Sequence, residues 1–197
     1  MEISAKMVKE LRDKTGAGMM DCKKALAETG GDFEKAVEYL REAGIAKASK
    51  KEGRQTAEGV IATYVHTGDK LAVMVEINCE TDFVARTDDF KTFARDIAMH
   101  IAASNPTCVS RDEVDQEMLA KEREIYKHQA LNEGKPEKII DKIVDGKIEK
   151  YYSEIVLMEQ PFVKDNEKTI EQVVKGMIGQ LGENMGIKRF ARFRLGE

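Results

Sequence analysis

Histidine, cysteine and carboxylate side chains are the groups in this sequence that could catalyse a reaction or hold a metal ion. The three histidines, His66, His100 and His128, show no metal-binding spacing such as H-E-x-x-H. The aspartates and glutamates are scattered along predicted helix faces as solvated charge, and no pair stands out as a general acid and base. The sequence therefore predicts no catalytic residue, no metal site and no cofactor.

The cysteines leave one enzymatic alternative open. Cys22, Cys79 and Cys108 are far apart, odd in number and free of C-x-x-C, which is typical of a reducing cytosol and argues against a disulfide framework. Cys79 with His66 or His100 could form a nucleophile and base pair of a thiol hydrolase, although nothing supplies a third orienting group. Cys22 precedes two lysines that could lower the pKa of its thiol, but burial as a small apolar residue is the expected role.

The segment T-G-A-G-M-M-D-C-K-K, residues 15–24, has the glycines of a phosphate-binding loop but not its pattern. It lacks G-x-x-x-x-G-K-[ST], and it joins two predicted helices rather than a strand and a helix. We therefore predict a tight turn between helices.

The charge distribution argues against direct binding of nucleic acid. Charged residues make up 35% of the 197 residues, yet the net charge is only -4, whereas such binding needs clustered Lys and Arg. The basic run K-R-F-A-R-F-R is predicted to be a strand with solvated charges rather than an RNA patch. The charged N-terminus contains no signal-peptide core and no apolar run is long enough to span a membrane, so we expect a cytoplasmic protein without membrane contact.

We predict a small helical module for residues 1–45, one of the elements that position the candidate functional residues. Ser4 is the predicted N-cap of a first helix, and Asp32 caps a third helix that is expected to stop at Gly44. Three helices of this length bury only a small core, so their outer faces are expected to bind other molecules. The lysine-rich residues 46–55 are predicted to be a linker.

Residues 56–197 are predicted to form an α+β core domain. Alternating apolar residues in 60–65 and 71–77 flank the turn H-T-G-D and predict a β-hairpin. Helical spacing in residues 87–104 predicts a helix that covers the small antiparallel sheet, and the basic run near the C-terminus is expected to close the sheet as a last strand.

Within this core, residues 109–152 predict a projecting antiparallel helical hairpin. Ser110 and Glu113 are the expected capping box of its first helix, and a short Gly-Pro turn joins it to the second. Val114, Met118 and Ile125 are expected to form a thin apolar seam along the first helix.

Four motifs occur in a fixed order along the chain. They are V-K-E-L-R-D-K-T-G-A-G-M-M-D-C-K-K-A-L near the start, E-T-D-F-V-A-R after the second strand, A-M-H-I-A-A-S in the next helix and Q-P-F-V after the helical hairpin. Together they resemble the bacterial elongation factor Ts family over essentially the whole chain, in a short form with one sheet-bearing subdomain. The resemblance implies a guanine-nucleotide exchange factor for the translational GTPase elongation factor Tu, which is not an enzyme and needs no cofactor of its own.

The resemblance also implies how the segment T-D-F-V works. In the family this segment reaches the GTPase domain of elongation factor Tu, inserts an aromatic side chain and dislodges the Mg²⁺ ion that helps to hold GDP. This role falls on Thr81, Asp82, Phe83 and Val84, with Phe83 as the inserted side chain. From the pattern alone, a large apolar residue after a strand is more often packed in the core, which is the alternative for Phe83.

Further partner-binding residues follow from the same resemblance. The three-helix module is similar to a ubiquitin-associated domain and is expected to dock on the GTPase domain of the partner. The implied contacts of the module are Leu11, Arg12, Met19, Met20 and Lys23. Positions near the partner in the core are His66, Val163 and Lys164.

Two expectations concern assembly. One chain offers half of the paired core found in longer family members, so we expect a homodimer that binds two partner molecules. The three small helices by themselves leave an alternative function open, that of a helical adaptor that binds another protein without exchange activity.

Overall fold

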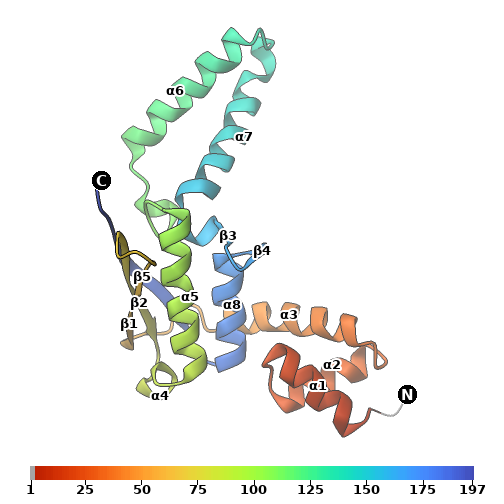
Figure 1. The fold of residues 1–197 in the computed structure, drawn as a ribbon. Coiled ribbons are helices and arrows are strands. Elements are labelled where there is room, and N and C mark those ends of the chain that lie inside the picture. Colours follow the sequence, from red (N-terminus) through yellow and green to blue (C-terminus); the bar gives the residue numbers. More distant parts are fainter. Residues whose placement is uncertain (1–2) are drawn as a thin grey trace. The chain divides into compact units, whose positions relative to one another are not determined.

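The computed structural model describes residues 3–197, and the chain is a mixed α+β protein, as expected from the sequence. The described residues form eight α-helices, a three-stranded sheet and a two-stranded ribbon (Figure 1). The chain divides into two compact units, each built from three segments. The first unit contains the chain up to Val60, Ile77–Phe93 and Gln172–Gly186. The second contains Ile61–Glu76, Ala94–Glu171 and Ile187–Glu197.

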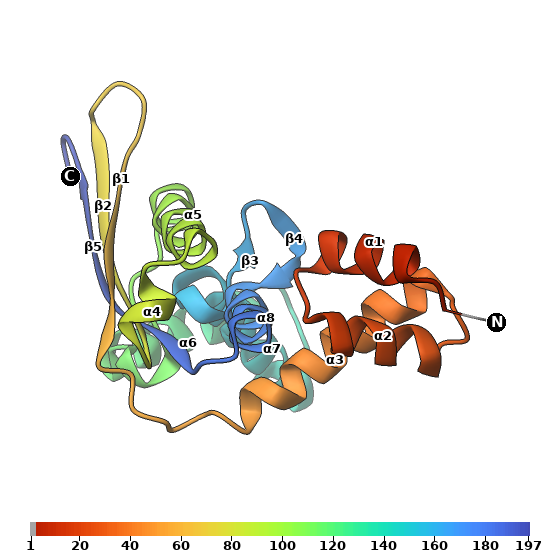
Figure 2. The same cartoon turned by 90° about the horizontal axis from the view of Figure 1, so that it is seen from below.

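Three helices open the chain, namely α1 (Ala5–Thr15), α2 (Met19–Glu28) and α3 (Phe33–Ser49), visible at the red and orange end of the ribbon in Figure 2. The two predicted N-caps are confirmed. The Ser4 hydroxyl accepts a hydrogen bond from the Met7 amide at 3.2 Å, and the Asp32 carboxylate accepts one from the Lys35 amide at 3.1 Å. Each cap satisfies an amide that the first helical turn leaves without a partner. The helices enclose a small core of Val8, Leu11, Cys22, Ala25, Leu26 and Ala36.

Helix α3 continues through Gly44 to Ser49, so the expected stop at Gly44 is wrong. A glycine inside a helix costs only about 1 kcal/mol relative to alanine, and the residues that follow it are good helix formers. The backbone at Gly44 lies against helix α8 (Ile170–Leu181), since a Cβ atom added to Gly179 would lie 2.9 Å from the Gly44 Cα. Gly179 therefore permits a close approach of the two helices.

Residues 46–49 of the expected linker belong to α3, and the stretch that follows them is held by hydrogen bonds. The Lys51 ammonium donates to the Gly182 carbonyl, and the Asn184 side-chain amide donates to the Arg54 carbonyl at 2.9 Å. The division into module, linker and core remains a prediction.

The three-stranded sheet consists of β1 (Glu58–Val65), β2 (Leu71–Cys79) and β5 (Met185–Arg194), with β2 in the centre (Figure 2). The His66 amide donates to the Leu71 carbonyl at 2.8 Å and so sets the register of the β1–β2 hairpin. The hairpin and the closing strand are therefore confirmed.

Alternation along β2 gives the sheet one buried face. The buried residues of this strand are Val73, Val75, Ile77 and Cys79. Helix α5 (Asp88–Ser104) shows helical spacing of its buried side chains, as expected for an amphipathic helix. The buried residues of α5 are Phe90, Phe93, Ala94, Ile97, Ala98, His100, Ile101 and Ala102.

Helices α6 (Gln116–Asn132) and α7 (Glu137–Ile155) form the predicted antiparallel hairpin (Figure 1). The expected capping box is wrong, because Ser110 leads into a single turn of 3-10 helix and Asp115 caps α6 instead. The expected seam is wrong for Met118 and Ile125, since both residues are 46% exposed, whereas Val114 is buried just before α6 begins. The residues that pack between the helices are Leu119, Tyr126, Ala130, Ile140, Ile143, Val144, Ile148 and Tyr152.

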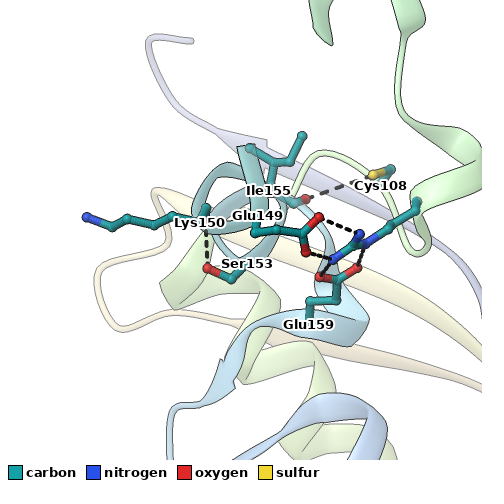
Figure 3. A network of polar contacts seen from close by, with 7 residues as sticks. Cys108, Glu149, Lys150, Ser153, Ile155 and Glu159 are labelled. Atoms are coloured by element: carbon teal, nitrogen blue, oxygen red, sulfur yellow. Dashed lines mark hydrogen bonds and ion pairs between the residues drawn. The ribbon is translucent and has the colours of Figure 1, made fainter. Parts of the chain in front are cut away.

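A polar network fastens the base of this hairpin, as Figure 3 shows for Glu149 and Glu159. The Arg111 guanidinium donates two hydrogen bonds to Glu149, at 3.1 and 2.7 Å, and two to Glu159, and it lies 4.2 Å from the Tyr152 ring centroid. The hydrogen bonds to Glu159 and Glu149 raise the pKa of Arg111, and the bonds from Arg111 lower the pKa of Glu149. This network ties the segment before α6 to the end of α7.

Candidate functional site

The turn that follows β2 places a phenylalanine on the surface. Thr81 precedes the four-residue helix α4 (Asp82–Ala85), and the Phe83 side chain is 78% exposed. The alternative that Phe83 packs in the core is therefore wrong. A phenylalanine in this position adds little to the stability of its own fold, but it offers a large apolar surface that a partner can bury.

Local hydrogen bonds explain why Phe83 points outward. The Thr81 hydroxyl accepts from the Val84 amide at 3.4 Å, and the Thr81 carbonyl accepts from the Ala85 amide at 3.2 Å. Ala85 is buried, and helical geometry places a side chain two positions earlier on the opposite face. An ion pair of 2.7 Å between Asp82 and Arg86 lies along the same short helix.

The predicted contacts of the N-terminal module separate into exposed and buried residues. Arg12, Met19, Met20 and Lys23 are exposed, with Met20 at 77%. Leu11 is fully buried in the core of the three helices, so we correct its expected direct contact with a partner. Its side chain holds the module together instead.

The turn between α1 and α2 collects the exposed residues of this module. Gly16 ends α1 with a φ of 67°, a left-handed conformation that favours glycine, and its amide donates to the Arg12 carbonyl at 2.7 Å. Met19 and Met20 begin the next helix. The segment T-G-A-G is therefore the tight turn that the sequence predicts, and it places Arg12 and the two methionines on either side of itself.

The remaining predicted site residues lie in the second unit. His66 follows β1 in the hairpin loop, and its Nδ1 atom lies 3.0 Å from the Tyr64 hydroxyl. Val163 and Lys164 join β3 (Pro161–Phe162) to β4 (Asp165–Thr169), a small ribbon that the sequence analysis did not predict.

A buried histidine holds the backbone of this ribbon. The Val163 amide donates to His100 Nδ1 at 3.2 Å, so that nitrogen carries no proton and Nε2 donates to Gln160 Oε1 at 2.9 Å. The Gln160 amide nitrogen in turn donates to the carbonyls of Glu154, at 2.6 Å, and Ser104, at 3.3 Å. The sequence analysis did not predict the bond between His100 and the Val163 amide. A signal for it was the polar Gln160 at the start of Q-P-F-V.

The surroundings of His100 make stability depend on pH. Burial lowers its pKa below the ordinary value of 6.5, so the unfolded chain takes up a proton at higher pH than the folded protein. The stability that neutral His100 contributes is fully present above pH 6.5 and decreases as the pH falls from there toward the lower folded pKa. The slope is at most about 1.4 kcal/mol per pH unit for one proton.

We expect the free energy of unfolding to decrease less between pH 7.5 and 5.5 in His100→Asn than in the original chain. The asparagine carbonyl can still accept from the Val163 amide, but it does not titrate. Urea unfolding at both pH values measures the difference. Equal decreases in both proteins would contradict a linkage through His100.

The three cysteines are buried and free, and burial raises the pKa of each thiol. The Cys79 thiol donates to the Thr81 carbonyl at 3.2 Å. A thiol that remains protonated is a poor nucleophile, so neither a thiol hydrolase nor a reactive Cys22 finds support. Among residues 3–197, no group of three or more His, Cys, Asp or Glu side chains is arranged to hold a metal ion. Nor do these residues include a helix with the length and apolar character needed to cross a membrane.

Comparisons with known proteins cover the whole chain. Residues 6–197 match the family model described as Elongation factor TS. The Elongation factor Ts of Desulforamulus reducens is 60% identical over 196 residues, which are 100% of this chain and 90% of the relative. The Elongation factor Ts of Solidesulfovibrio magneticus is 60% identical over 195 residues, 99% of this chain and 98% of the relative. That of Geobacter sulfurreducens is 58% identical over 197 residues, 100% of this chain and 91% of the relative.

Proposed function

Since the chain belongs to the elongation factor Ts family, we propose that it is a guanine-nucleotide exchange factor for the translational GTPase elongation factor Tu in the cytoplasm. It binds the GDP form of this partner, disturbs its Mg²⁺ site and promotes release of GDP so that GTP can bind. The observation that carries the proposal is Phe83, which is 78% exposed within the T-D-F-V segment that the family resemblance implicates.

Burial of Phe83 in the partner supplies the driving force. Full burial of a phenylalanine side chain contributes about 1.5–3 kcal/mol, enough to shift a switch element between two packings. If the element that moves helps to coordinate Mg²⁺, the diphosphate of GDP loses the cation that compensates its charge. GDP then dissociates faster.

Exchange requires no covalent chemistry and no cofactor of this chain. Thermodynamic linkage requires the exchange factor and the nucleotide to weaken each other's binding by the same factor. Binding of GTP therefore expels the exchange factor and completes the cycle.

The N-terminal module supplies a second contact in this proposal. Its exposed surface offers two cations, Arg12 and Lys23, beside the flexible apolar side chains of Met19 and Met20. Methionine side chains adapt well to a partner surface. We propose further contacts through His66, Val163 and Lys164. The Lys164 ammonium already forms an ion pair with Asp96 at 2.6 Å, so its contact with a partner would compete with that carboxylate.

The direct test is release of a fluorescent GDP analogue from purified elongation factor Tu. We expect the protein to accelerate release at substoichiometric amounts, because an exchange factor dissociates and acts again. A folded protein that binds the GTPase without accelerating release would overturn the proposal in favour of the adaptor function.

We also propose that the protein is a homodimer, on the basis of exposed apolar residues on the sheet. The β1–β2 register places Ile61, Val65 and Met74 on one face, where they are 66%, 58% and 50% exposed. Such a face is suited to a self-complementary contact with a second copy. We expect light scattering of the original chain at micromolar concentration to give the mass of a dimer. The double variant Ile61→Lys and Met74→Lys should give the mass of a monomer. A monomeric original chain would contradict the proposal.

A further inference from the structure

The turn that carries Phe83 is fastened to a residue far away in the sequence. Glu183 lies between α8 and β5, 102 residues after Thr81. Its carboxylate accepts the Thr81 hydroxyl at 2.6 Å with one oxygen and the Thr81 amide at 3.0 Å with the other. Hydrogen bonds to a charged acceptor are stronger than bonds between neutral groups.

This contact determines the orientation of the Thr81 side chain. The single hydroxyl proton of Thr81 points to Glu183, which leaves an oxygen lone pair to accept from the Val84 amide at 3.4 Å. Helix α4 has only four residues, too few to be stable alone. The conformation that exposes Phe83 therefore depends on a partner from outside the turn, and Glu183 supplies it.

A reciprocal bond reinforces the attachment of Glu183. The Asn184 amide donates to the Glu80 carboxylate at 2.6 Å. Glu80 and Thr81 are thus bonded to Asn184 and Glu183, and each of the two segments provides one carboxylate that accepts from the other. Arg54 forms an ion pair with Glu80 at 3.7 Å, and the Arg54 carbonyl accepts a hydrogen bond from the Asn184 side chain. The segment that carries Glu183 is therefore also tied to Glu80, the residue before Thr81.

We propose that Glu183 is a positioning residue for nucleotide exchange, an inference that rests on the proposed function. Its carboxylate holds Thr81 so that the Phe83 ring is already in the exposed orientation before the partner binds. Preorganisation lowers the cost of ordering the turn in the complex. Glu183 itself need not touch the partner.

We expect Glu183→Ala to lower the maximal rate of GDP release at saturating exchange factor about tenfold, since small misplacements of a functional group reduce rates by one to two orders of magnitude. The concentration for half-maximal effect should change less, because the surface of the N-terminal module is unchanged. Glu183→Gln should be intermediate, since its amide offers one acceptor oxygen instead of two. Glu52→Gln removes an exposed carboxylate from the same unit and should leave the rate unchanged.

A double-mutant cycle with Phe83→Ala separates positioning from general stability. If Glu183 acts through Phe83, Glu183→Ala should have little further effect on the rate in the Phe83→Ala background. Full additivity of the two losses would overturn the inference. A Glu183→Ala variant that releases GDP at the rate of the original chain would also overturn the inference, and the proposed exchange function would remain intact.

Two further measurements keep the outcomes distinct. Thr81→Val removes the hydroxyl from the other side of the bond and should reproduce the Glu183→Ala loss, even if Glu183→Ala itself fails to fold. Thr81→Ser keeps the hydroxyl and should recover most of the rate that Thr81→Val loses. If the original chain fails to accelerate release at all, the proposed function is wrong and the positioning role is lost with it. If the original chain and Thr81→Val accelerate GDP release to the same rate, only the positioning role is wrong.

Discussion

Replacement of Phe83 by alanine is expected to remove most of the acceleration of GDP release while the protein still folds and binds elongation factor Tu. The side chain is 78% exposed, so its loss takes no contact from the core and should change the free energy of unfolding by less than about 0.5 kcal/mol. In the complex the ring would forfeit about 1.5–3 kcal/mol of burial, which corresponds to a roughly ten- to hundredfold slower release if that energy drives the switch.

The measurement is the rate of release of a fluorescent GDP analogue at increasing exchange-factor concentration. Phe193→Ala is a matched control, since Phe193 is 69% exposed on β5 and lies outside the proposed contacts. A Met19→Ala and Met20→Ala double variant should instead raise the concentration needed for half-maximal release, because it weakens docking rather than the switch. Release by Phe83→Ala at the original rate would remove Phe83 from the mechanism.

Gly59→Ala is expected to destabilise the protein by roughly 3–5 kcal/mol, the sum of backbone strain and overpacking. Gly59 lies in β1 with a φ of 150°, a conformation that side-chain-bearing residues rarely adopt. A Cβ atom there would overlap the Ile77 carbonyl oxygen and lie 2.8 Å from the Asn78 Cα. Since both neighbours are backbone atoms of β2, the two strands would have to separate.

Urea unfolding followed by circular dichroism measures this loss. Gly186→Ala in β5 is the matched control, because a Cβ atom there meets no atom within 4 Å. We expect that control to stay within about 1 kcal/mol of the original chain. Similar midpoints for the two variants would show that the β1–β2 pairing tolerates a side chain at Gly59.

The features that were predictable from the sequence depend on short-range interactions. Ser4 and Asp32 cap helices because their side chains reach amides only three residues away. The hairpin follows from alternating apolar residues on either side of H-T-G-D. The family resemblance rests on local motifs in the same way, and it pointed to Phe83 although the apolar pattern favoured its burial.

Two features of the helical hairpin were not predicted correctly, because several nearby residues could serve the same role. Asp115 caps α6 in place of Ser110, and the Glu113 carboxylate instead accepts from the Val109 amide at 3.0 Å. The seam of the helical hairpin depends on the rotation of α6, which a charged helix with few apolar residues does not specify by its own periodicity.

Most of the helices, the three-stranded sheet, the family and the segment that carries Phe83 could be predicted from the sequence alone. Only the tertiary structure showed that Leu11 is buried, that Phe83 is exposed, and that His100 and Glu183 hold the two turns. The hydrogen bond that the Thr81 hydroxyl donates to Glu183 joins residues that are 102 positions apart. No periodicity or propensity along the chain encodes such a pair, because it forms only when packing of the whole unit brings the two segments together.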